Sequence, residues 1–188
     1  MTVPTSRVDE KMMKRLLSVL MLISLPMMSA AADRAEIDAD VASVLKDFYH
    51  LASGNKELVA KANGVLVFPS VIKAGFVVGG EYGEGALLVG GKTVDYYSIA
   101  AASVGIQIGA QERAEIILFM DKGAFDKFRQ TDGWNVGVDG SIAVIDAGAG
   151  KGVNTDSIKD PVIAVILLNR GLMANISLEG SKISKIDR

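Results

Sequence analysis

The chain has 188 residues, 49% of them hydrophobic and 22% charged, with a formal net charge of −2 and no cysteine. The missing cysteines exclude disulfides and thiol chemistry. After residue 32 the chain keeps 16 basic and 20 acidic side chains, a formal charge of −4. That balance disfavours nucleic acid as a partner and weakens attraction to anionic lipid in the absence of a local basic patch. The roughly 156 residues that follow residue 32 suit one domain with a real core.

Residues 1–32 are predicted to be a secretory signal peptide. A basic start, a short apolar stretch and a run of small residues follow one another: Lys11, Lys14 and Arg15, then 16–28, then Ser29, Ala30, Ala31 and Ala32. This order is the signature of a signal for export. The apolar run of about 13 residues is short for a bilayer span, which takes roughly 20.

We therefore expect cleavage after Ala32, with Ala30 as the alternative, and a periplasmic or secreted location. A retained N-terminal anchor is the other interpretation of this segment. Residues 1–11 precede the signal and include two acidic side chains, so Met12 or Met13 is a candidate start of translation. The remaining residues, 33–188, are predicted to form a single domain.

Two helices are predicted to begin this domain. Within 33–52, apolar residues recur at spacings of three and four and share one helical face: Ile37, Val41, Val44, Leu45, Phe48 and Ala52. Acidic residues crowd the start, where the helix dipole favours negative charge. Ser53 and Gly54 indicate a stop, Asn55 is the predicted cap of a second short helix through Ala62, and a turn follows.

The stretch 65–91 is apolar and β-branched, which predicts strands at 65–68, 76–82 and 86–89. Glycine nevertheless recurs through it: Gly75, Gly79, Gly80, Gly83, Gly85, Gly90 and Gly91. Glycine weakens a strand interior because it packs no side chain, so this density indicates bends, bulges or close backbone contacts. The glycines predict a strongly curved sheet, and they either shape a cavity or permit tight packing.

The later elements are predicted in the following order: a long glycine-broken strand at 97–110, a buried strand at 114–120, a helix at 121–130 capped by Asp121, an alternating segment at 135–147, a loop at 148–159, a strand at 161–168, a turn at Asn169, Arg170 and Gly171, and a return strand at 172–178. Strands bunched together, with helices at one end and in one insertion, indicate an α+β fold. We predict a strongly curved, glycine-rich antiparallel sheet or partial barrel, with an N-terminal helix pair and one inserted helix.

An ordered series of short motifs runs through the chain: Phe68-Pro69, Lys73-Ala74-Gly75-Phe76, Gly79-Gly80, Gly83-x-Gly85, Tyr96-Tyr97, Ser103-x-Gly105-x-Gln107-x-Gly109-x-Gln111, Trp134, Gly137-x-Asp139, Gly171-Leu172 and Glu179-Gly180. This series resembles the SYLF domain over nearly all of the chain after residue 33. The resemblance implies kinship with bacterial secreted proteins and with eukaryotic proteins linked to lipids and the actin cytoskeleton. For an exported protein it implies lipid binding, whereas actin binding makes little sense.

The candidate lipid-binding residues are Phe48, Tyr49, Lys73, Phe76, Lys92 and Lys151. Lys73 lies inside a matching motif; a lysine among apolar residues either keeps its ammonium in water or pairs with a headgroup phosphate. Phe48 and Tyr49 end the apolar stripe of the first helix. That stripe is expected to dock on the sheet, since a membrane-surface helix would carry a basic polar face and this one is acidic.

We predict no catalytic residue, no metal site and no cofactor, and hence no enzymatic activity. His50 is the only histidine and lies on the polar side of the first helix, away from any evident nucleophile. The glycines around Lys151 lack the spacing of a phosphate-binding loop. Asp132, Asp139 and Asp146 lack the ligand pattern of a calcium loop and are expected to form turns.

The predicted function is exported, non-enzymatic binding of phospholipid or another amphipathic molecule at the cell envelope, in an apolar cleft rimmed by lysines. The alternative is a structural or interaction protein of the envelope that self-associates or binds a membrane protein, marked by an exposed apolar patch. A small transmembrane barrel is disfavoured by the low aromatic content. A hydrolase would need a serine or a carboxylate pair converging near His50 or another base.

Overall fold

The computed structural model describes residues 33–147, 160–171, 178 and 180–188, without the side chains of 76–78, 103–109 and 168–171. The segment from Ala32 to Arg188 forms one compact unit. The described elements are α2 (Arg34–Leu51), α3 (Asn55–Lys61), β1 (Gly64–Val89), β2 (Lys92–Phe119), α4 (Lys122–Gln130), β3 (Trp134–Asn135), β4 (Ala143–Asp146), β5 (Val162–Gly171) and β6 (Lys182–Ile186). The described strands form one six-stranded sheet. The α+β class is therefore confirmed.

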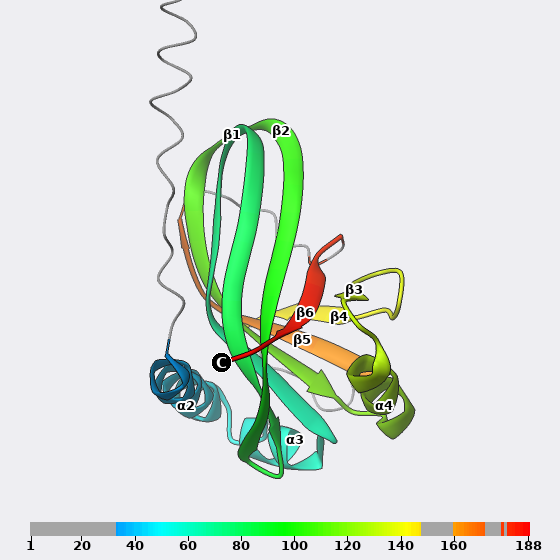
Figure 1. Cartoon of the computed structure of the whole chain (residues 1–188). Helices are drawn as coiled ribbons and strands as arrows, with labels where there is room; N and C mark the ends of the chain where they lie inside the picture. The colour runs from blue at the N-terminus through cyan, green and yellow to red at the C-terminus, as the bar shows by residue number, and fades with distance from the viewer. Residues whose placement is uncertain (1–32, 148–159, 172–177, 179) are drawn as a thin grey trace, which may run out of the picture. The chain divides into compact units, whose positions relative to one another are not determined.

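A single long hairpin, β1 paired with β2, dominates the sheet (Figure 1). Its turn consists of Gly90 and Gly91, whose φ angles of 57° and 77° are those that a two-residue hairpin turn demands and that glycine adopts without strain. The separate strands predicted at 65–68, 76–82 and 86–89 are wrong, because β1 is continuous through all three. The segments predicted at 97–110 and 114–120 likewise belong to the single strand β2.

Irregularities in register let these strands bend without breaking their ladder. The register shifts between Phe68 and Val71, between Gly75 and Val77, and between Leu87 and Leu88. Such bulges sharpen the local twist of a strand while the pairing resumes on either side. Pro69, which has no N–H to donate to a ladder, lies within the first shift.

The hairpin is folded over, so that its turn returns toward its open end (Figure 1). We call 64–75 with 109–119 the base half, and 79–89 with 92–103 the turn half. β1 contacts itself across the fold: a Cβ on Gly83 would lie 2.7 Å from the Ser70 carbonyl oxygen, and one on Gly85 would lie 2.0 Å from that of Val67. At these two positions the glycines serve close backbone packing, which confirms one of the two predicted roles.

Each half is extended by two further strands along the free edge of β2. β5 and then β4 continue the base half, while β6 and then β3 continue the turn half. The β4–β5 pair is parallel. The prediction of a wholly antiparallel sheet is therefore wrong for this pair.

The turn predicted at Asn169, Arg170 and Gly171 is wrong, because Arg170 and Gly171 continue β5 and pair with Glu112 and Gln111 of β2. The return strand predicted at 172–178 lies outside the described residues except for Leu178, and the loop predicted at 148–159 lies wholly outside them.

One apolar cluster, the inner cluster, fills the space between the two halves and includes residues of both. Its buried members are Leu66, Phe68, Val71, Leu87, Tyr97, Ile99, Ile117, Phe119, Phe125, Phe128, Trp134, Val136, Val162, Ala164, Ile166, Leu178 and Ile183. α4 closes it with Phe125 and Phe128; the Phe128 ring meets Trp134 edge-on, with ring centroids 5.7 Å apart. The helix predicted at 121–130 is confirmed, with the Asp121 carboxylate accepting from the Ala124 N–H at 2.8 Å.

A second cluster, the outer cluster, joins α2 and α3 to the opposite face of the strands. Its buried members are Ile37, Val41, Val44, Leu45, Phe48, Leu58, Val65, Val67, Ala86, Leu88, Ala114, Ile116, Leu118, Ile163, Val165 and Leu167. Neighbouring strand residues alternate between the two clusters, as the period of two requires. The predicted apolar stripe of the first helix is confirmed as a docking face on the sheet.

The second predicted helix is confirmed as α3, but Asn55 does not cap it. Gly54 occupies the N-cap position without a side-chain hydrogen bond. The buried Asn55 amide instead donates to the Phe48 carbonyl oxygen at 2.8 Å, which satisfies an acceptor in the last turn of α2. This bond fixes the start of α3 against the end of α2. Within the described residues, no helix is both long and apolar enough to cross a bilayer.

Candidate functional site

A pocket of about 380 Å³ opens between the two N-terminal helices and the sheet, beside the hairpin turn. Its wall comprises Leu45, Tyr49, Lys56, Val59, Ala60, Ala62, Val65, Leu88, Gly90 and Gly91. Most of these are aliphatic or glycine, so the interior favours an apolar guest. The size and the lining are those of a small-ligand site.

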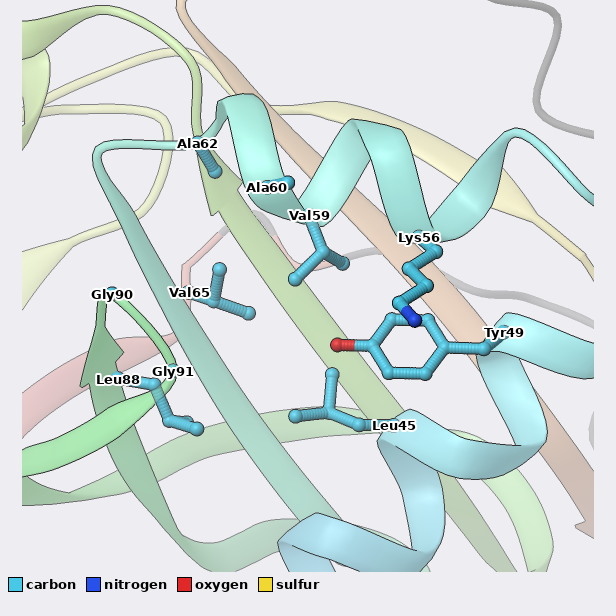
Figure 2. A pocket seen from close by; sticks show the side chains of 10 residues that line it. All are labelled: Leu45, Tyr49, Lys56, Val59, Ala60, Ala62, Val65, Leu88, Gly90 and Gly91. Carbon is cyan, nitrogen blue, oxygen red and sulfur yellow. The ribbon is translucent and has the colours of Figure 1, made fainter.

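Two polar side chains stand on the helical wall of the pocket (Figure 2). Tyr49 comes from the last turn of α2 and Lys56 from the first turn of α3. Figure 2 shows the Tyr49 hydroxyl directed among the aliphatic side chains, with the Lys56 amine beside the tyrosine ring. Tyr49 follows Phe48 in the chain, and Lys56 follows Asn55. The hydrogen bond from the Asn55 amide to the Phe48 carbonyl oxygen therefore holds Tyr49 and Lys56 close to each other.

The electrostatics of the pair suit recognition of an anion. Desolvation by burial raises the pKa of Tyr49 above its ordinary value of 10.0, so its hydroxyl stays protonated and can donate. Within the described part of the chain, the Tyr49 hydroxyl forms no hydrogen bond. The Lys56 amine forms no ion pair with a described side chain. Both groups therefore keep their donor capacity for a guest, which a carboxylate or phosphate would use well.

The structure places the predicted site residues in different locations. Tyr49 lines the pocket, and Lys92 is exposed directly after the wall residue Gly91. Phe48 is fully buried in the outer cluster and is not part of the wall. Lys73 lies eight residues along β1 from the wall residue Val65, roughly 25 Å along an extended strand. The Phe76 side chain and Lys151 lie outside the described part of the chain.

Sequence reasoning missed Lys56 and placed the apolar cleft elsewhere. We expected curved strands to enclose the cleft, but the space between the two halves is filled by the inner cluster. The pocket forms instead between the helices α2 and α3 and the strand residues Val65 and Leu88, beside the hairpin turn. One signal for Lys56 was available in the sequence. Lys56 follows the predicted start of a short helix in which Leu58 faces the core, and Val59 and Ala60 come directly after Leu58.

No catalytic or metal centre is evident among the residues that the structure describes. His50 is exposed in the last turn of α2. Grouped His, Asp and Glu side chains suitable for a metal ion are absent from that part of the chain. The Asp139 carboxylate accepts from the Asn135 backbone N–H at 2.7 Å and so forms the turn that was predicted for it.

Together, the folded hairpin and the pocket under its helices define a class: an α+β domain with a doubled-over sheet and an apolar pocket bearing a tyrosine and a lysine. Comparison with known proteins narrows this class. The Ysc84 family model, described as Las17-binding protein actin regulator, matches residues 100–188.

Several vertebrate relatives match a larger part of the chain. SH3 domain-containing YSC84-like protein 1 of Xenopus laevis is 32% identical over 154 residues, covering 74% of this chain and 45% of the relative. The proteins of the same name from Rattus norvegicus and Homo sapiens are each 30% identical over 152 residues, covering 74% of this chain and 44% of the relative. The chain spans less than half the length of these curated relatives. It belongs to the SYLF-domain family, as the resemblance predicted.

Proposed function

We propose that this protein is a non-enzymatic binder of an amphipathic molecule, a phospholipid or a lysophospholipid, and that the α2–α3 pocket is where it binds. The observation that carries the proposal is the combination of an aliphatic wall with two donors, Tyr49 and Lys56, that have no partner within the described chain. An acyl segment would lie against Leu45, Val59 and Leu88, and an anionic headgroup would accept from the two donors.

Binding of a single-chain anionic lipid tests the proposal. We would titrate lysophosphatidylglycerol, below its micelle concentration, into the full chain and into a chain that begins at Asp33. Because the second protein lacks the apolar stretch 16–28, equal affinity of the two would place binding in the described domain. Lysophosphatidylcholine, whose headgroup is zwitterionic, serves as the comparison and should bind more weakly because it carries no net negative charge for Lys56.

Two pocket variants and one matched control locate the site. Tyr49→Phe and Lys56→Gln should each weaken lysophosphatidylglycerol binding by roughly ten- to a hundredfold, the worth of one hydrogen bond to a charged group. Lys61→Gln is the control, because Lys61 lies on the same helix, pairs with Glu57 at 2.8 Å and does not line the pocket. Unchanged affinity in both pocket variants, or an equal loss in Lys61→Gln, would exclude the pocket as the site.

We also propose that residues 1–32 direct export and are removed after Ala32, which would place the binder in the periplasm or outside the cell. The support is the order of basic, apolar and small residues in this segment. Expression of the full chain in a bacterial host, followed by mass spectrometry of the periplasmic fraction, would reveal a new N-terminus at Asp33. A product that begins at Ala31, or one that stays uncleaved in the membrane fraction, would support the alternative site or a retained anchor.

A second candidate function is a protein–protein role at the envelope. Its support is the exposure of large apolar side chains on β1, where Ile72 is 56% and Tyr82 is 45% accessible. Exposed apolar side chains of this size can mark an interaction surface when they gather in one patch. Light scattering over a range of concentrations decides whether the protein self-associates, and Ile72→Ser should then reduce association while leaving lipid affinity intact. A concentration-independent monomer would count against self-association.

A further inference from the structure

A buried charged cluster joins the two halves of the folded hairpin. Arg113 and Glu115 come from the base half of β2 and are 1% and 0% exposed, while Glu81 comes from the turn half of β1 and is 6% exposed. Arg113 Nε lies 2.5 Å from Glu115 Oε1, and Arg113 Nη2 lies 2.9 Å from Glu81 Oε2. The Ser181 hydroxyl, just before β6, adds a longer contact to Glu81 at 3.4 Å.

The contact between Arg113 and Glu81 exists only because the hairpin folds over. In the β1–β2 ladder Arg113 pairs with Val71, whereas Glu81 pairs with Ala101, at a distant position on the same ladder. A flat hairpin would hold the two side chains far apart. Arg113 also lies at the register shift between Glu112 and Ala114 in the pairing of β2 with β5, and a bulge of this kind re-aims a side chain.

The cluster contains more negative than positive charge. One guanidinium faces two carboxylates, so ionisation of both glutamates leaves a formal charge of −1 where water does not reach. Such a charge is costly unless it is fully paired. Within the described residues Glu115 Oε2 has no hydrogen-bond partner, and neither have Arg113 Nη1 and Nη2, although Nη2 forms the ion pair with Glu81. Protonation of one carboxyl group would remove the excess charge.

We propose that this cluster is a proton-operated latch: a proton on Glu115 tightens the contact between the base half and the turn half, and its loss loosens that contact. The described charged groups that face Glu115 are Arg113 on its own strand and Glu81 on β1. On its other flank β5 contributes the apolar Ile166, which pairs with Glu115 in the ladder. The latch is independent of the α2–α3 pocket and of the function proposed for it.

The titration of Glu115 supports the latch. Burial, together with repulsion from Glu81 and against the opposing influence of Arg113, raises the pKa of Glu115 from 4.5 to about 7. Because the folded protein holds this proton more tightly than the unfolded chain, the contribution to stability is full below pH 4.5. It declines as pH rises toward 7 and is lost above that.

The test is denaturant unfolding of the full chain at several pH values between 5 and 8, followed by the fluorescence of Trp134, the single tryptophan, in the inner cluster. We compare the native sequence with Glu115→Gln, which keeps the shape and cannot ionise. The native folding equilibrium constant should fall, relative to the variant, by at least about tenfold across this range. Glu112→Gln is the matched control, because Glu112 is exposed on the same strand, and it should follow the native curve. An equal pH dependence in Glu115→Gln and the native protein would overturn the latch.

A second variant and a local measurement distinguish a latch from a general effect on stability. Glu81→Gln removes the neighbouring negative charge, so it should move the decline to lower pH. In the native protein, amide hydrogen exchange, corrected for its intrinsic pH dependence, should accelerate at pH 8 more in 79–83 than in 64–68. In Glu115→Gln this difference between the two stretches should be absent. Equal acceleration in both stretches, or no shift of the decline in Glu81→Gln, would contradict the proposal.

Discussion

Single residues determine how closely the two halves of the hairpin approach, and Gly85 is the clearest case. A Cβ there would lie 2.0 Å from the Val67 carbonyl oxygen and 2.8 Å from the Phe68 ring. Neither neighbour has room to withdraw, because both belong to the buried core. Gly80 lies in the same strand and has more room. A Cβ on Gly80 would lie 3.8 Å from its nearest neighbour, the Ala101 carbonyl oxygen.

We expect Gly85→Ala to destabilise the fold by about 3 kcal/mol or more, since the added methyl group forces the halves apart. Gly80→Ala should change the free energy of unfolding by less than about 0.5 kcal/mol, as most unconstrained surface substitutions do. Urea unfolding of both variants measures the difference. A Gly85→Ala protein as stable as Gly80→Ala would mean that the halves are not in backbone contact at this point.

At the scale of single residues, the sequence predicted the roles of side chains that contact residues close to them in the chain. Asp121 as a helix cap and Asp139 as a turn former depend on contacts within four residues, and both were foreseen. The partners of Arg113 and the placing of Lys56 beside Tyr49 depend on how separate segments meet. Residue type and spacing carry no signal for that.

Among the elements, α2 is attached to the sheet both by its apolar stripe and by one carboxylate. Asp38 accepts from the Thr93 hydroxyl at 2.9 Å and from the Tyr96 hydroxyl at 3.1 Å, which ties the start of the helix to β2. Above the Tyr96 ring lies the Arg34 guanidinium, 5.7 Å from its centroid. Because α2 also supplies Leu45 and Tyr49, its attachment holds one wall of the pocket.

Asp38→Ala should lower the free energy of unfolding by about 1–2 kcal/mol through the loss of these two hydrogen bonds. Asp40→Ala, at an exposed position of the same helix, serves as the control and should stay within about 0.5 kcal/mol of the native protein. Thermal unfolding followed by circular dichroism provides the comparison. Similar losses in both variants would point to helix charge rather than to the contacts with β2.

Helices were predicted well and strands poorly, for a physical reason. A helix is stabilised by residues three and four apart, which the sequence displays directly. Strand boundaries depend on a partner, and here β2 accompanies β1 through every bulge, so the glycines that signalled breaks lie inside one ladder. The same dependence explains why 169–171, a turn by composition, continues β5.

In the molecule as a whole, two four-strand layers share one hairpin, and the Arg113 cluster is the polar part of their interface. Arg113→Met should destabilise the protein by about 3–5 kcal/mol at pH 7.5, because it leaves two buried carboxyl groups without their cation. The triple variant Arg113→Met, Glu81→Leu, Glu115→Leu should recover much of that loss by replacing the ions with apolar contacts. Denaturant unfolding compares the variants, and a mild loss in the single variant would show that water, or a proton on Glu115, compensates for the missing cation.

The doubled-over hairpin also has a consequence for how the chain reaches its native state. Closing Gly64 onto Phe119 joins residues far apart in sequence, whereas Val89 and Lys92 are separated only by the two-glycine turn. Loop-closure entropy therefore favours pairing that starts at this turn and zips toward the open end. A high contact order of this kind is typical of folding in milliseconds to seconds. Substitutions near Gly90 should slow folding, and those near Gly64 should mainly speed unfolding. The turn that lines the pocket is thus also where the strands first acquire their register.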